Sequence, residues 1–131
     1  MIHLLPIYLF VVALPPQPVT TILMDVSAYC PCELCCGRFS DGYAASGRRA
    51  VGKMIAAPKS YRFGTTMIVP GYGAARVWDR GGAIKSAGER ANGKTLRHDR
   101  IDLLFPTHSA AKKWGRQLLR VEIRKVNHAN N

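Results

Sequence analysis

The sequence predicts a mainly β fold, a small barrel of short strands with one helix. The chain has 131 residues, of which 47% are hydrophobic, so it can bury the core of a single domain. Short stretches that are rich in β-branched residues, or in which apolar residues alternate, recur along the chain. No heptad or longer repeat is present, and the apolar content argues against a disordered chain.

Five segments show strand patterns. In the last of them, Leu119, Val121 and Ile123 alternate with charged residues, which indicates a half-buried strand. Residues 70–73, Pro-Gly-Tyr-Gly, predict a turn between the second and third strands. The five predicted strands are residues 19–29, 65–69, 74–79, 100–105 and 119–125.

One helix is predicted between the last two strands. Thr107 or Ser109 can cap its start, and Gly115 can end it. Its core-facing residues are predicted to be Ala110, Ala111 and Trp114. Residues 86–99 show no periodicity and predict an exposed loop.

The charge of the chain is strongly positive and unevenly placed. The formal net charge is +11. Residues 1–37 contain only Asp25 and Glu33 as charged residues, whereas residues 38–131 contain 19 basic and 6 acidic residues. This charge indicates an acidic partner without identifying it. The basic residues are scattered and lack the aromatic–basic pattern of an RNA-binding sheet, so nucleic acid is not expected.

The N-terminus carries an apolar run at residues 4–14. A membrane span needs roughly 20 apolar residues, so no stable span is expected, but the run has the length of a signal-peptide core. Val11 and Ala13 offer small residues before the Pro-rich stretch 15–18, although no basic residue precedes the run. We therefore expect residues 1–18 to be a signal peptide, or an apolar segment with a linker, and the protein to be exported to the periplasm, the cell envelope or the medium. The alternative is a buried first strand.

All four cysteines lie in one short stretch, as Cys30, Cys32, Cys35 and Cys36. Disulfides are the favoured interpretation for an exported protein. A metal site made of these four thiolates is a less favoured alternative, because four ligands within seven residues are sterically awkward and no second Cys or His pair is evident. Free or redox-active thiols are a third possibility.

Two of the few acidic residues follow or interrupt apolar strands. Asp79 ends a strand and precedes paired glycines, which let a ligand approach the backbone closely. Asp102 lies among Ile and Leu residues. The pattern alone favours a solvent-facing Asp102. A buried Asp102 would instead have a raised pKa, as a general acid needs near neutral pH.

An ordered series of short motifs runs from Val26 to Ile123, the most specific being Asp79-Arg-Gly-Gly-Ala-Ile-Lys85. The others, in chain order, are Val26-Ser-Ala-Tyr29, Ala44-Ala-Ser-Gly47, Phe63-Gly-Thr65, Val69-Pro-Gly-Tyr-Gly73 and Arg100-Ile-Asp102, followed by Phe105, Ala111 and Trp114-Gly115. The series resembles the 3D domain, named for three aspartates, which is similar to the catalytic barrel of membrane-bound lytic transglycosylase A and of stationary-phase and resuscitation-type muralytic proteins. The resemblance implies a six-stranded double-psi β-barrel with one or two short helices over residues 19–126, followed by a short tail, 127–131.

The resemblance also implies an activity and a site. A lytic transglycosylase cleaves the bond between N-acetylmuramic acid and N-acetylglucosamine and leaves a 1,6-anhydro end. Asp102 would be its acid and base, and Asp79 would support it by raising the pKa of one of the pair. No cofactor is expected, and the monomeric protein would act on peptidoglycan or another anionic wall polymer. The predicted substrate-binding residues are Gly81, Gly82, Lys85, Ser46, Gly47, Trp78 and Tyr72. For Lys85, Trp78 and Tyr72 the alternative is ordinary barrel packing.

Two departures from the family pattern keep other functions open. Ala57 stands where the family has its first aspartate, and residues 86–99 are longer than the family's usual link between the other two. One carboxylate can serve as acid and then as base, so the loss at Ala57 does not by itself exclude catalysis. A non-catalytic barrel that binds the cell wall is the main alternative, and a metal or redox protein built on the cysteines is a further one.

Overall fold

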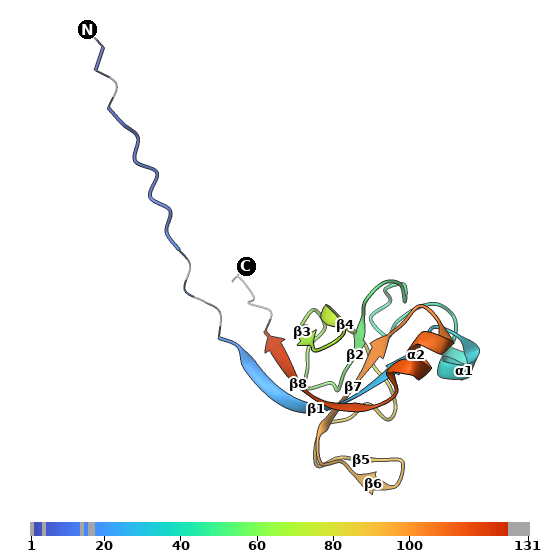
Figure 1. Cartoon of the computed structure of the whole chain (residues 1–131). Helices are drawn as coiled ribbons and strands as arrows, with labels where there is room; N and C mark the ends of the chain where they lie inside the picture. The colour runs from blue at the N-terminus through green and yellow to red at the C-terminus, as the bar shows by residue number, and fades with distance from the viewer. Residues whose placement is uncertain (1, 4, 14, 16–17, 126–131) are drawn as a thin grey trace.

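The computed structural model describes residues 2–3, 5–13, 15 and 18–125, and its body is a closed barrel (Figure 1). The barrel strands are β1 (Thr20–Tyr29), β2 (Ile55–Ala56), β3 (Thr66–Val69), β4 (Gly73–Asp79), β7 (Asp99–Leu104) and β8 (Gln117–Arg124). They are arranged in the order β1-β7-β2-β4-β3-β8. The β1–β7 and β2–β4 pairs are parallel, and the other pairs are antiparallel. A mainly β, six-stranded barrel is thus confirmed.

Each of the five predicted strands corresponds to a barrel strand, with ends that differ by one or two residues. The sixth, β2, was not predicted because its two residues are too few to show alternation. Yet β2 closes the barrel by pairing with β4 on one side and β7 on the other. It therefore brings the ends of these two strands together.

Two short helices accompany the barrel, α1 (Glu33–Cys36) and α2 (His108–Trp114), and the 3-10 turn η1 (Gly37–Phe39) follows α1. The predicted caps of α2 are confirmed: Thr107 Oγ1 accepts a hydrogen bond from the backbone N–H of Ala110 at 3.2 Å, and Gly115 follows the last turn with a φ of 67°. The helix packs on β1, where the Trp114 indole donates to the carbonyl of Val26 at 3.3 Å.

The core fills the inside of the barrel with one side chain out of two along each strand. Its largest fully buried members are Met24, Val26, Ile55, Met67, Val69, Val77, Ile101, Leu103 and Val121. A second, smaller cluster joins buried Ala44, Met54 and Leu104. Because Leu104 is the last residue of β7 and Met54 precedes β2, while Ala44 belongs to the segment after β1, this cluster packs that segment against the barrel.

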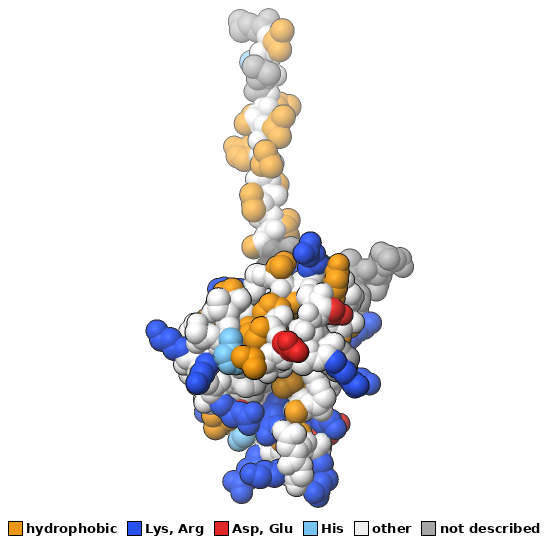
Figure 2. All heavy atoms as spheres, turned by 90° about the vertical axis from the view of Figure 1, so that its right-hand side faces the viewer, with side chains coloured by type: hydrophobic (Ala, Val, Ile, Leu, Met, Phe, Trp, Pro, Cys, Tyr) orange, Lys and Arg blue, Asp and Glu red, His pale blue; other side chains and the backbone are white. Residues whose placement is uncertain are grey.

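Residues 86–99 form a hairpin rather than the predicted irregular loop. The strands β5 (Arg90–Ala91) and β6 (Lys94–Thr95) pair in antiparallel fashion. Asn92 and Gly93 turn the chain with φ angles of 51° and 76°, as expected for an Asn-Gly hairpin turn. The hairpin projects from the barrel in Figure 1. Figure 2 shows Lys and Arg side chains spread over the visible face of the body and gathered at the end where the hairpin projects.

The described residues of the apolar run 4–14 lie outside the barrel (Figure 1). They have no helix or strand, and side chains such as Leu9 and Phe10 are almost fully exposed. The run therefore does not supply a buried first strand. In the part of the chain that the structure describes, every helix is too short or too polar to cross a bilayer. The predicted tail, 127–131, lies outside the described residues.

Candidate functional site

The two aspartates predicted to be catalytic line the same pocket, which has a volume of about 550 Å³. Asp79 ends β4 and Asp102 lies in β7, while β2 runs between them, so that Ala56 pairs with both. The side chain of Ala56 is buried and also lines the pocket.

Asp102 is a half-buried carboxyl on the outer side of the barrel. Its neighbours Ile101 and Leu103 point into the core, so Asp102 points away from it. Residues of segment 30–50 line the same pocket and cover this side of the barrel. Asp102 is therefore half-buried, whereas the sequence pattern alone favoured a solvent-facing side chain. Burial raises the pKa of Asp102 to about 6, and the charge of Asp79 acts in the same direction.

Two groups act on the pKa of Asp102 in the opposite direction. The Ser27 hydroxyl, on the neighbouring strand β1, donates a hydrogen bond to Asp102 Oδ1 at 3.0 Å. The positive charge of Arg116 also lowers the pKa. The burial outweighs both, so the carboxyl retains its proton to a higher pH than an ordinary aspartate.

Asp79 is held in place by three hydrogen-bond donors. The Tyr29 hydroxyl donates to Oδ2 at 2.7 Å, and the backbone N–H groups of Ala45 and Arg80 donate to Oδ1 at 2.8 and 2.9 Å. Burial, and then the hydrogen bond to Asp79, raise the pKa of Tyr29, so its hydroxyl remains a donor. These donors fix the orientation of the carboxylate.

The remaining predicted binding residues divide into two groups. Gly81 and Gly82 line the pocket. A Cβ at Gly81 would lie 2.8 Å from Ile84 Cγ1, so this position leaves no room for a side chain. Ser46 and Gly47 do not line the pocket, but they belong to the turn that presents the N–H of Ala45 to Asp79. Lys85 is half-buried and lies outside the pocket lining.

The two aromatic residues predicted to stack on sugar lie outside the pocket lining. Tyr72 is buried in the core, its hydroxyl donates to the carbonyl of Leu104 at 2.7 Å, and its ring packs against Phe105. Its ring has no exposed face on which a sugar could stack. Tyr72 therefore packs in the barrel, which was the alternative to sugar binding. Trp78 is half-buried, and the Arg48 guanidinium lies 3.7 Å from the centre of its ring.

Ala57, at the family's first aspartate position, is fully buried and belongs to the hydrophobic core. The pocket nevertheless has a third carboxylate among its lining residues, Asp41, which is exposed and accepts a hydrogen bond from the N–H of Tyr43. Asp41 lies in the segment after β1 and outside every motif, so the sequence did not single it out.

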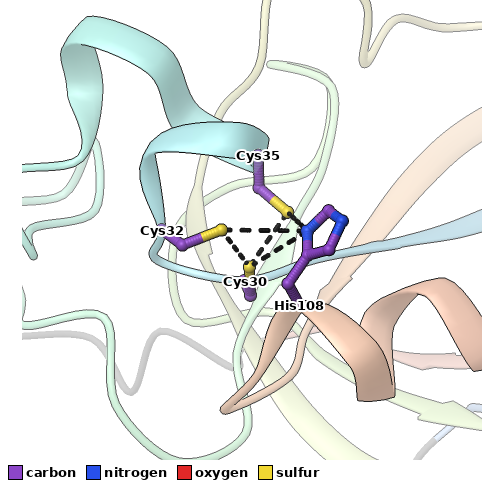
Figure 3. Close-up of side chains that lie close together, drawn as sticks. All are labelled: Cys30, Cys32, Cys35 and His108. Carbon is purple, nitrogen blue, oxygen red and sulfur yellow. Dashed lines mark hydrogen bonds between the residues drawn. The ribbon is translucent and has the colours of Figure 1, made fainter.

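Three of the cysteines, which belong to the same segment as pocket-lining Pro31 and Cys36, gather around a histidine. Figure 3 shows the sulfur atoms of Cys30, Cys32 and Cys35 and the Nδ1 edge of His108 pointing toward one another. All four ligand-capable atoms lie within 4.8 Å of each other. Cys36 is not part of this group and donates instead to the carbonyl of Cys30 at 3.2 Å.

The grouping corrects the metal-ligand set considered from the sequence, which contained Cys36 and lacked His108. The side chain of Cys36 points to the backbone carbonyl of Cys30, whereas α2 brings in His108 from 73 residues beyond Cys35 in the chain. All four cysteines, each of them a described residue, are free thiols, so the predicted disulfides stay a prediction.

The sequence also missed Tyr29, Ser27 and Ala45. Ser27 and Tyr29 both belong to the motif of the first strand, and they are two residues apart, so their side chains lie on the same face. This spacing could have indicated them. Ala45 acts through its backbone, which no residue type reveals. Comparison of the chain with protein-family models and with curated proteins found no match.

Proposed function

We propose that this protein is a lytic transglycosylase that cleaves peptidoglycan between N-acetylmuramic acid and N-acetylglucosamine. The observation that carries the proposal is the state of Asp102, a half-buried carboxyl with a pKa raised to about 6 that faces a pocket beside a second carboxylate. A carboxyl with such a pKa can give up a proton and take one back near neutral pH.

In the proposed reaction, Asp102 protonates the glycosidic oxygen as the bond to the muramyl C1 breaks. The resulting carboxylate then takes the proton of the muramyl C6 hydroxyl, whose oxygen bonds to C1 and closes the 1,6-anhydro ring. The proton lost in the first step is regained in the second, so Asp102 ends as it began. The charge of Asp79 supports the positive charge that develops at C1 and helps to keep the pKa of Asp102 raised.

The environment of Asp79 suits this reaction better than hydrolysis by the Asp79–Asp102 pair. A glycoside hydrolase normally needs a second carboxylate that is free to attack C1 or to activate water. Three donors already bind the oxygens of the Asp79 carboxylate, so the protein itself occupies the atoms that would have to attack C1 or bind the water. An intramolecular hydroxyl attack needs only the one carboxyl that changes its protonation state.

The basic body and the apolar N-terminus fit the same proposal. Residues 38–131 carry all 19 Lys and Arg residues, which favours the wall and its carboxylates as an anionic partner. The substrate lies outside the cytoplasm, and the run at 4–14 would serve as the export signal.

The experiment is digestion of purified sacculi with the full chain, with mass analysis of the released muropeptides. We expect anhydro-muropeptides from the wild type and a rate lower by about 10²–10⁴-fold for Asp102→Asn. Asp99→Asn is the matched control: it makes the same change at the start of the same strand, at a residue outside the pocket lining, and should keep the activity under conditions in which the variant is folded.

A second candidate function is a barrel that binds the wall without cleaving it, and the observation that favours it is the burial of Ala57 in the core. Sacculus binding without any product from the wild type would select this function. Products with reducing rather than anhydro ends would overturn the transglycosylase proposal in favour of hydrolysis.

A further inference from the structure

We propose that Cys30, Cys32, Cys35 and His108 bind a structural zinc ion. The three thiols come from the turn after β1 and from α1, and the imidazole comes from the first residue of α2. His108 Nδ1 lies 3.4 Å from the sulfur of Cys35, 3.8 Å from that of Cys32 and 3.9 Å from that of Cys30. Three sulfurs from one segment of the chain thus face one nitrogen from a distant segment (Figure 3).

The spacing of these atoms suits a tetrahedral ion. With Zn–S bonds of about 2.3 Å and a Zn–N bond of about 2.0 Å, the edges of the tetrahedron are about 3.5–3.8 Å. The three N···S distances agree with this value to within a few tenths of an ångström. The sulfur of Cys30 lies closer to those of Cys32 and Cys35, at 2.7 and 3.0 Å, so the ion would spread the thiols by roughly 1 Å.

The donor set selects the metal and its role. Three thiolates and an imidazole form one of the common ligand sets of structural zinc. Because the protein supplies all four ligands, no position stays open for water or substrate, and the ion would have no part in catalysis. A disulfide would use only two of the three sulfurs and would leave the third thiol and the imidazole unexplained.

The ion would tie α1 to α2. Helix α1 has four residues, none of them buried, and its first residue has no side-chain cap. Such a helix has little stability of its own. The proposed site anchors it to α2, which packs on β1. Pro31, Cys35 and Cys36 of the same segment line the carboxylate pocket, so the metal would fix one wall of that pocket.

The first test is the metal content of the purified full chain, reconstituted with zinc under reducing conditions. We expect about one tightly bound zinc per chain, and the cobalt-substituted protein should show the intense visible bands of tetrahedral thiolate coordination. This readout uses the wild type and depends on no variant. It is also independent of the proposed enzymatic function, because zinc can bind whether or not the protein cleaves peptidoglycan.

Variants locate the site. His108→Ala should weaken zinc binding by more than about 100-fold, whereas His108→Cys replaces one ligand by another and should retain it. Cys36→Ser is the matched control, since Cys36 stands next to a proposed ligand but outside the cluster, and it should bind zinc as the wild type does.

Three results would overturn the proposal. One is a wild type that binds no zinc although all its thiols are free. Another is zinc binding that is equally strong in the wild type and in His108→Ala. The third is evidence for a native disulfide: protein purified without reductant would have a mass lower by two hydrogens and would bind zinc only after reduction. It would then lose the zinc rapidly when air is readmitted.

Discussion

The carboxylate pocket and the thiol cluster share one wall, the segment from Pro31 to Cys36. We expect them to affect the stability of the folded chain in opposite directions. In the pocket, Asp102 is covered by protein with one hydroxyl donor, and its raised pKa reflects an unfavourable environment for its charge. In the cluster, three thiols face one imidazole, and a single cation would satisfy all four groups. We infer that the first region reduces the stability of the folded chain and that the second increases it.

Removing the metal should have the largest effect on stability. If zinc holds α1 to α2, its binding free energy is part of the folding free energy. A chelator should then lower the melting temperature by at least about 10 °C, since about 1 kcal/mol corresponds to roughly 4–8 °C in a domain of this size. Thermal unfolding followed by circular dichroism measures it.

A reductant provides the control for chelation. With zinc in the cluster, a reductant alone should leave the melting temperature unchanged. A fall caused by the reductant and not by the chelator would show that disulfides, rather than a metal, stabilise this segment.

The opposite sign is expected in the pocket, where Asp102→Asn should stabilise the protein. The pKa of Asp102 rises on folding to about 6, so the native state binds the proton more tightly than the unfolded state. The stability of the wild type therefore falls as the pH rises from about 4 to about 6, and the loss persists above that range. Asn carries no charge and can still accept the Ser27 hydrogen bond, so the variant should be more stable by about 1–3 kcal/mol at about pH 8.

Urea unfolding at several pH values measures this difference, which should vanish below about pH 4, where both side chains are neutral. Asp99→Asn makes a useful contrast. The carboxylate of Asp99 accepts hydrogen bonds from the Tyr61 hydroxyl and from the N–H of Ala87, so its replacement should destabilise the protein. If Asp102→Asn were less stable than the wild type at high pH, the burial of the charged Asp102 would not destabilise the fold.

The two regions also differ in how far the sequence could predict them. Asp79 and Asp102 stand in local motifs, so their pairing followed from a resemblance carried by neighbouring residues. The thiol cluster needed His108, which α2 brings in from 73 residues beyond Cys35, and no local pattern marks that histidine. The other barrel strands were predictable because they are rich in β-branched residues or alternate apolar with polar residues. Strand β2 has only two residues, too few to show such a pattern. The Asn92-Gly93 pair is typical of a hairpin turn. It was overlooked because residues 86–99 were judged by their lack of periodicity alone.

A smaller effect on the pocket should come from Arg116. Its charge lowers the pKa of Asp102, so Arg116→Gln should raise that pKa and move the alkaline fall in cleavage rate to higher pH. Arg116 is largely exposed, so salt should screen its charge and shrink the difference between variant and wild type. The control is Arg120→Gln, an equal change of charge on β8, which should leave the pH profile in place. An unchanged profile for Arg116→Gln would mean that the basic surface does not reach the pocket.

The smallest effect is expected from the hairpin, which touches neither region. Glu89 and Leu96 already pair across it, with the N–H of Leu96 donating to the carbonyl of Glu89 at 2.9 Å. Deleting the two strand pairs 90–91 and 94–95 joins these residues through the same Asn92-Gly93 turn and keeps the register, because two residues are removed from each side. The cleavage rate, the zinc content and the pH profile should all match the wild type, with a loss of stability below about 1 kcal/mol.

A lower rate in the shortened chain would show that the inserted hairpin contributes to substrate binding from outside the pocket. Since residues 86–99 carry several basic side chains and gather positive charge at that end (Figure 2), the loss would then be larger on intact sacculi than on short glycan fragments. An equal loss on both substrates would instead indicate a change in the barrel itself. The two substrates together therefore separate a contact with the wall polymer from damage to the fold.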